Sequence, residues 1–196
     1  MKKLLLCVAI AATTFLTTNA QDGERIFKKF KGDVSLGYAA PLGSGPGGIV
    51  FAMEPKYALM DKLSVGLRME GAVFGNFSNT LIYENENAKT AESYLATADY
   101  YFSNNYTLRP FAGAGAGVFV LSTDALNFND KRTTAKFGGL IRAGVEVKHF
   151  RLGIEYNFVP GTDIILYNSN GNQSTGKSKN GYVGIKAGFC FGGGPL

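Results

Sequence analysis

Apolar and polar side chains alternate along most of the chain from residue 32 onwards. Between residues 49 and 57, for example, Ile49, Phe51 and Met53 share one face, whereas Glu54 and Lys56 share the other. A period of two is typical of β-strands, because successive side chains point to opposite faces. The pattern predicts eight strands, at residues 32–40, 49–57, 63–77, 93–102, 109–121, 134–147, 151–159 and 181–191. No stretch after residue 31 has a convincing helical period, so we expect an all-β, antiparallel fold.

The connections between these strands alternate in length. Those at 58–62, 103–108 and 148–150 are short. Those at 41–48, 76–92, 122–133 and 160–180 are polar or rich in Gly and Pro, and most are longer. Short turns at one end and long loops at the other are typical of β-barrels of the bacterial outer membrane, whose long loops lie outside the cell. We therefore expect an eight-stranded up-and-down transmembrane β-barrel at residues 32–196, with both termini on the periplasmic side.

The first twenty residues have the features of a secretory signal peptide. Lys2 and Lys3 precede an apolar run that ends at Leu16, and short side chains lead up to Ala20. The apolar run is too short to span a bilayer as a helix. The order of these features predicts cleavage between Ala20 and Gln21, rather than the alternative of a buried N-terminal helix. Residues 21–31 would then form a short periplasmic lead-in to the barrel.

Charged side chains within the predicted strands fall on one face, opposite the apolar face. In the strand at 134–147, for instance, Arg142 and Glu146 oppose Phe137 and Ile141. A small barrel in lipid has its polar face inside, and charges buried there must pair. We therefore predict a structural polar network in the lumen, made by Glu54, Arg68, Glu70, Arg142, Glu146, Glu155 and Lys186. An ion pathway through the same charges is the alternative.

Aromatic side chains on the apolar face gather near the two ends of the strands. Those at the short-turn ends are Tyr57, Tyr100, Phe102, Phe189 and Phe191. Those at the long-loop ends are Tyr38, Phe77, Tyr94, Phe137 and Phe158. Two aromatic belts around an aliphatic band are typical of proteins that cross both membrane–water interfaces. The belts favour an outer-membrane protein over its structural rival, a soluble periplasmic barrel with a ligand cavity.

Composition gives little sign of catalysis. The net charge is +5, or +3 once Lys2 and Lys3 leave with the signal peptide. The basic residues are scattered rather than clustered, so we expect no nucleic-acid partner. Cys190 would be alone in the mature chain, which excludes an intramolecular disulfide. One histidine and one cysteine do not suffice for a metal site, and we expect no cofactor.

Two features still resemble parts of catalytic or binding sites. Residues 171–178, GNQSTGKS, match the phosphate-binding pattern G-x-x-x-x-G-K-[ST]. The segment after them alternates as a strand and cannot be the helix that such a loop needs, so we expect a polar loop and no nucleotide. His149 could be the base of a lipid-modifying hydrolase. It falls in the shortest periplasmic turn, however, away from the outer leaflet where that chemistry occurs.

Four short motifs carry a family resemblance: RPFAGAGAG at 109–117, MDKLSVG at 60–66, LGIEY at 152–156 and GFCF at 188–191. Through them, residues 32–191 resemble the eight-stranded outer-membrane barrel proteins, the broad class of the OmpA membrane domain, OmpX and OmpW. The resemblance implies contact with outer-membrane lipid and assembly by the barrel-insertion machinery, and we expect a monomer. Family members end on an aromatic residue, whereas this chain continues from Phe191 to Leu196.

The sequence offers no catalytic set, and this absence shapes the expected function. We expect a non-enzymatic outer-membrane protein with a structural or surface-interaction role, carried by extracellular loops rich in Asn, Ser and Thr. A narrow pore or small-molecule carrier across the outer membrane is the alternative. A lipid-modifying barrel enzyme is a third, less favoured hypothesis because of the position of His149.

Overall fold

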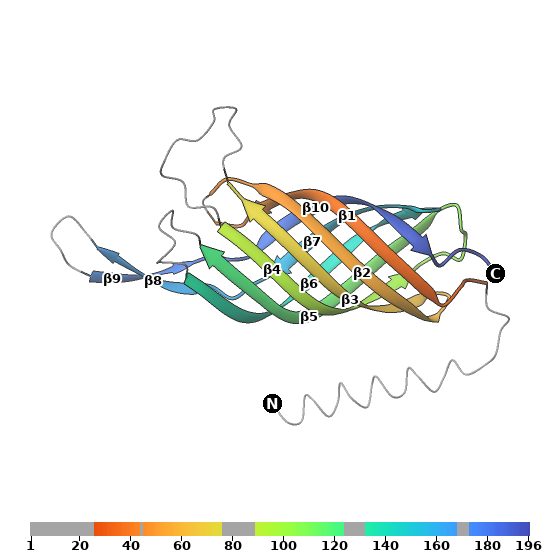
Figure 1. Ribbon diagram of the computed structural model, residues 1–196, viewed down its shortest axis with the longest axis horizontal. Coiled ribbons are helices and arrows are strands. Elements are labelled where there is room, and N and C mark those ends of the chain that lie inside the picture. Colours follow the sequence, from red (N-terminus) through yellow and green to blue (C-terminus); the bar gives the residue numbers. More distant parts are fainter. Residues whose placement is uncertain (1–25, 44, 76–88, 124–131, 168–172) are drawn as a thin grey trace, which may run out of the picture.

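The computed structural model of the chain describes residues 26–43, 45–75, 89–123, 132–167 and 173–196. Eight strands form a closed antiparallel barrel, and two more form a separate sheet (Figure 1). The barrel strands are β1 (Phe30–Pro41), β2 (Gly48–Met60), β3 (Leu63–Phe74), β4 (Lys89–Tyr101), β5 (Arg109–Thr123), β6 (Arg132–Val147), β7 (Phe150–Phe158) and β10 (Tyr182–Gly192). Each pairs with the barrel strands before and after it, and β1 closes the barrel against β10. The predicted eight-stranded up-and-down barrel is thereby confirmed.

The strand boundaries differ from the predicted ones by a few residues. β1 begins at Phe30, inside the predicted lead-in, and β4 begins at Lys89, before its predicted start at residue 93. The predicted signal peptide with its cleavage site at Ala20 and Gln21 lies outside the described residues, as does Phe77. Among the residues that the structure describes, no helix is long and apolar enough to cross a membrane.

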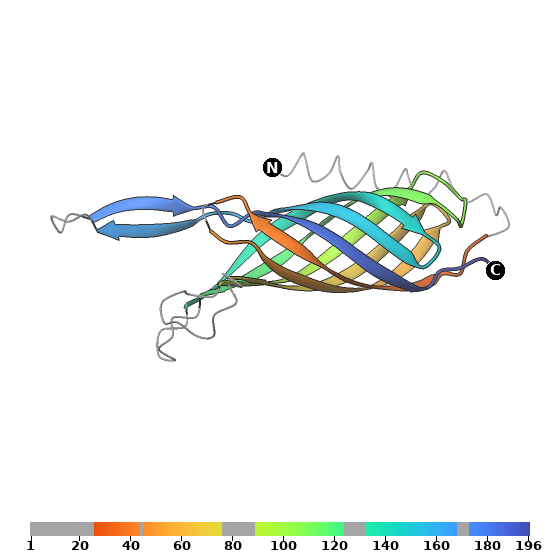
Figure 2. The ribbon, with the colours of Figure 1, turned by 90° about the horizontal axis from the view of Figure 1, so that it is seen from above.

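The prediction of a loop throughout residues 160–180 is wrong. β8 (Thr162–Tyr167) and β9 (Gln173–Ser178) pair antiparallel along their whole length. Their two-stranded sheet projects beyond the barrel, at the end opposite the C-terminus (Figure 2). The β-prone residues from Ile164 to Tyr167 favour a strand at β8. β9 was not predicted, because its residues are polar and show no apolar alternation. Its backbone pairing with β8 defines it as a strand.

The outer surface of the barrel is apolar and its interior is charged. Leu67 is 66% exposed and Ile185 is 58% exposed, whereas their strand neighbours Arg68 and Lys186 are buried. This inversion of the usual globular arrangement follows from the alternation of side chains along each strand. Water would not favour such a surface, but hydrocarbon would.

The outer surface also carries two groups of exposed aromatic side chains. The group near the short turns consists of Phe30, Tyr100, Phe102, Phe150, Phe189 and Phe191. The group near the long connections consists of Tyr38, Tyr94, Phe137 and Phe158. Tyr57, also predicted for the first group, is half-buried and packs edge-on against Phe30, with ring centroids 5.2 Å apart. Apart from Phe77, the predicted belts are therefore present, with Phe30 and Phe150 as additions.

Candidate functional site

Buried ion pairs fill the middle of the lumen. Within the described part of the chain the network has six cations (Lys31, Lys56, Arg68, Arg142, Arg151 and Lys186) and six anions (Asp33, Glu54, Glu70, Asp99, Glu146 and Glu155). Each of these side chains is at most 9% exposed. Within this network six cations balance six anions, which is the arrangement that a low-dielectric interior tolerates. Arg109 is buried outside the network, where its guanidinium donates to the backbone carbonyls of Asp61 and Ser103.

The layer of ion pairs nearer the short turns centres on Asp99. The Lys56 ammonium lies 2.7 Å from the Asp99 carboxylate and also binds Asp33. A guanidinium nitrogen of Arg151 lies 2.8 Å from the same carboxylate oxygen, Oδ2 of Asp99. This layer also contains a direct ion pair between Lys31 and Glu146. The Tyr101 hydroxyl accepts a hydrogen bond from Lys31 and donates one to Glu146. Asp99 is thereby held by several cations at once.

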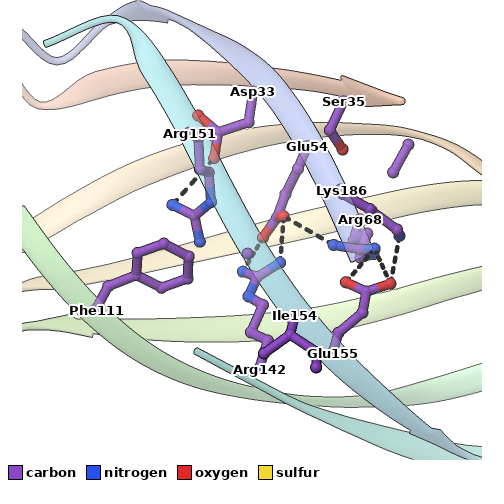
Figure 3. A pocket seen from close by; sticks show the side chains of 12 residues that line it. Asp33, Ser35, Glu54, Arg68, Phe111, Arg142, Arg151, Ile154, Glu155 and Lys186 are labelled. Atoms are coloured by element: carbon purple, nitrogen blue, oxygen red, sulfur yellow. Dashed lines mark hydrogen bonds and ion pairs between the residues drawn. The ribbon is translucent and has the colours of Figure 1, made fainter. Parts of the chain in front are cut away.

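The layer nearer the long connections is built around two arginines. Arg142 donates two hydrogen bonds of 2.6 Å to the Glu54 carboxylate, and Arg68 donates to Glu155 at 2.7 and 2.8 Å (Figure 3). Lys186 joins this second pair by binding Glu155. The layer is completed by Glu70, which binds Arg68 and Lys186 and accepts a 2.6 Å hydrogen bond from Tyr182. Arg142 donates from two nitrogens, one to each Glu54 oxygen, and such charge-assisted, bidentate bonds are among the strongest that side chains form. Arg68 reaches both Glu155 oxygens through Nη2 alone.

The strongest of these links cross the lumen instead of running along its wall. Arg142 on β6 reaches Glu54 on β2, and Arg68 on β3 reaches Glu155 on β7. In neither case are the two strands neighbours in the barrel. An eight-stranded barrel is just wide enough for its side chains to fill. The network therefore braces opposite walls and occupies the space that a pore would need.

All seven residues predicted for the lumen lie in this network. The structure adds five charged residues that the sequence analysis left out: Lys31, Asp33, Lys56, Asp99 and Arg151. A signal for three of them was present, since Asp33, Lys56 and Asp99 each alternate with the apolar, outward-facing residues of their strands. Lys31 lay in the predicted lead-in, outside any predicted strand. Arg151 was the first residue of its predicted strand, where the alternation of side chains does not yet show which way a residue points.

An apolar cluster occupies the lumen on the side of the long connections. Val50, Leu95, Phe119 and Leu140 are each at most 2% exposed and pack together there. The cluster also includes Ala39, Ala72, Ala91, Val159 and Tyr182. This cluster was not predicted, because only the charged residues of the inward face entered the predicted lumen network. The apolar cluster therefore lies between the ion pairs and the end of the barrel that carries the long connections.

The short-turn end of the lumen is closed by the lead-in. Phe27 is only 2% exposed. The Arg109 guanidinium lies 4.1 Å from the ring centre of Phe27 and 4.1 Å from that of Tyr101. The Asp61 carboxylate accepts hydrogen bonds from the backbone amides of Ile26 and Phe27 at 3.2 to 3.3 Å. Arg109 is thus stacked between two rings while the lead-in is tied to the β2–β3 turn.

The chain beyond Phe191 helps to form this closure. Phe27 pairs with Pro195 in an antiparallel bridge. The Leu196 amide donates to the Ile26 carbonyl at 2.9 Å, and the Lys28 amide donates to the Gly194 carbonyl at 3.0 Å. The residues that follow the last strand therefore form a backbone clasp with the lead-in.

The other candidate groups for chemistry are His149 and Cys190. His149 is exposed in the β6–β7 turn, and its two ring nitrogens lie 3.0 Å from the Tyr106 hydroxyl and from the Cys190 carbonyl oxygen. Its ring also stacks on Phe189. Cys190 is a free, buried thiol. No group of three or more His, Cys, Asp or Glu side chains among the described residues could hold a metal ion.

The phosphate-binding pattern at 171–178 lies partly outside the described residues. Its described part, Gln173–Ser178, is the strand β9 and pairs with β8. After it comes β10, a barrel strand rather than a helix. The strand–loop–helix arrangement of a phosphate-binding loop is therefore not formed there.

Comparison with solved structures finds the same fold in outer-membrane proteins. Neisserial surface protein A is 16% identical in sequence, with a TM-score of 0.59 over 83% of this chain and 95% of that protein. The outer membrane protein OprG from Pseudomonas aeruginosa is 12% identical, with a TM-score of 0.53 over 87% of this chain and all of OprG. No protein-family model and no curated protein sequence matches the chain.

These likenesses agree with the closed barrel, the apolar exterior and the aromatic belts described above. All three features are what a barrel needs in order to sit in lipid with no unpaired strand edge. The chain is therefore an eight-stranded β-barrel of the outer-membrane type.

Proposed function

We propose that this barrel is a non-enzymatic outer-membrane protein whose role, structural or surface-interacting, is exerted through its extracellular side. The observation that carries the proposal is the filled lumen. The lead-in around Phe27 covers one end, ion pairs brace the middle, and the apolar cluster around Phe119 occupies the other end. Because the lumen is filled in this way, the loops are the part of the molecule that is free to contact other molecules.

The β8–β9 hairpin supports this assignment to the loop side. It projects beyond the barrel on the side away from the C-terminus (Figure 2). A barrel has no need of such an extension to close, because its eight strands already pair in a ring. A two-stranded sheet also has unpaired backbone groups along both edges. The hairpin is therefore the first segment in which to seek a surface interaction.

The test removes the hairpin and keeps the barrel. Residues 162–178 are replaced by an Asn-Gly turn, which closes a tight hairpin. The matched control replaces the periplasmic turn at Lys148 and His149 in the same way. Cells that display each variant are compared for aggregation and for adhesion to protein-coated surfaces, after a gel-mobility shift on heating has shown that the barrel is folded.

We expect the loop-side variant to lose adhesion or aggregation while the control variant keeps it. Because the first variant removes only one connection, a second one also shortens the connections at 76–88 and 124–131. Unchanged cell-surface behaviour and unchanged envelope integrity after removal of all three would contradict the proposal.

A narrow pore or carrier is the second candidate, and one feature of the network favours it. Arg142 binds Glu54 and also lies 2.7 Å from Asp99, so its guanidinium is shared between two carboxylates. Arg151 is shared in the same way between Asp33 and Asp99. A guanidinium shared between two carboxylates can move from one to the other, and such an exchange of ion pairs would open a path for solutes through the lumen. Conductance across a planar bilayer distinguishes this candidate from the first.

The non-enzymatic part of the proposal has its own measurement. His149 lies at the short-turn end with both ring nitrogens near hydrogen-bonding partners, which supports a positioning role in the turn. We expect the mass spectrum of lipid A to be the same in cells with and without the overproduced protein. A new lipid A species that disappears in a His149→Ala variant would identify an enzyme instead.

A further inference from the structure

A small cavity lies among the ion pairs of the lumen (Figure 3). Its volume is about 30 Å³. Charged side chains from both layers line it, among them Asp33 and Arg151 from one layer and Glu54, Arg68 and Glu155 from the other. A buried water molecule needs roughly 10–15 Å³ of such space. The cavity therefore has room for about two water molecules and for little else.

Two polar atoms of the lining residues lack a hydrogen-bond partner among the described residues. They are Oδ1 of Asp33 and Nε of Arg68, both buried. The Lys31 ammonium lies 3.8 Å from Asp33 Oδ1, beyond hydrogen-bond distance. Cys190 lies opposite Asp33 in the β1–β10 register, but a thiol is only a weak donor. Leaving such groups unsatisfied in the interior is unfavourable, because each group loses its hydration and gains no hydrogen bond in return.

We propose that this cavity is a hydration site, in which one or two water molecules bridge Asp33 and Arg68. A carboxylate oxygen needs a donor, whereas the guanidinium Nε–H needs an acceptor. An anion cannot donate to the first and a metal cation cannot accept from the second, but water does both. The balanced charges of the network likewise leave no net charge for an ion to neutralise. The Ser35 hydroxyl also lines the cavity and can donate or accept.

The hydration site adds a second link between the two layers, beside the Arg142 guanidinium, which binds Glu54 in one layer and Asp99 in the other. It lies between the lead-in closure at Phe27 and the apolar cluster around Phe119, so its water exchanges slowly with solvent. The inference does not depend on the proposed surface role, because it concerns only the packing of the lumen. A dry cavity here would leave the proposed loop function untouched.

The test combines crystallography with oxygen-17 relaxation dispersion of water, which detects long-lived internal water molecules. Crystals of the folded barrel are soaked separately in bromide and in rubidium. The variant Gly153→Ala adds a methyl group at the cavity, where a Cβ would lie 3.3 Å from the Ala143 carbonyl oxygen and 3.5 Å from Phe111. The control Gly71→Ala makes the same change on the outer surface, where nothing lies within 4 Å.

The hydration site predicts electron density within hydrogen-bond distance of Asp33 Oδ1 and Arg68 Nε, with no anomalous signal from either ion. It also predicts that Gly153→Ala loses at least one long-lived water molecule and that Gly71→Ala loses none. Anomalous density in the cavity would overturn the proposal in favour of an ion site. Wild-type crystals without density there would overturn it in favour of a dry gap, and this comparison holds even if Gly153→Ala fails to fold.

Discussion

Replacement of Arg142 by methionine tests whether the lumen network holds the barrel together. Arg142 makes three close contacts: two hydrogen bonds of 2.6 Å to Glu54 and one of 2.7 Å to Asp99. Methionine keeps much of the side-chain length but removes the charge. Glu54 would keep more distant cations, Lys56 and Arg68, each 3.7 Å away. Its carboxylate would nevertheless be left without its bidentate partner in a buried position.

The magnitude follows from the cost of leaving a buried charge unpaired. Breaking one partner of a buried ion pair destabilises a protein by about 3–5 kcal/mol. The change in the unfolding equilibrium is then roughly two to three and a half powers of ten, at about 1.4 kcal/mol per power. With a urea dependence of about 1–3 kcal/mol per molar, the unfolding midpoint should fall by at least about 1 M.

The assay is urea unfolding of the barrel in lipid vesicles. The chain has no Trp, so circular dichroism and the gel-mobility shift serve as probes. The matched control is Lys136→Met on the same strand, since the Lys136 ammonium makes an exposed 3.3 Å hydrogen bond to the Gly161 carbonyl. We expect the control to stay within about 0.5 kcal/mol of the wild type. An Arg142→Met variant as stable as this control would refute the idea that the network braces the barrel.

Three further predictions concern packing. A Cβ at Gly37 would lie 2.1 Å from a backbone oxygen of β10, so Gly37→Ala should abolish the heat-dependent gel shift, whereas Gly71→Ala should keep it. Phe27→Ala should uncover the Arg109 guanidinium and make the lead-in cleavable by protease at lower temperature than in wild type; equal cleavage temperatures would contradict the closure. Maleimide should label Cys190 at least tenfold more slowly in the folded barrel than in urea, as mass spectrometry can follow.

The barrel itself could be predicted because each strand shows a local alternation of apolar and polar residues. A period of two identifies each strand, and placing Arg142 and Glu146 on one face settles which face is inside once lipid is considered. The alternation of short and long connections then fixes the topology. No long-range information is needed for these steps, which is why the strands, the belts and seven lumen charges could be named.

The missing parts depend on contacts between distant segments. Nothing near Asp99 in the sequence indicates that Lys56 and Arg151 converge on it, because they come from β2 and β7. The closure by Phe27 requires the tail at Pro195 to meet the lead-in across the whole length of the chain. The β9 strand has no pattern of its own and exists through its pairing with β8. Such features become visible only when the barrel has brought the segments together.

Conductance of the purified wild-type barrel across a planar bilayer tests the central claim most directly. A lumen braced by ion pairs and closed at both ends should carry no steady current, with protein insertion shown independently by protease protection. Arg142→Met, which removes a cross-lumen brace, is the informative comparison and should conduct more than the wild type if it conducts at all. Stable, long-lived open channels from the wild-type protein would contradict the filled lumen and transfer the function from the loops to a pore.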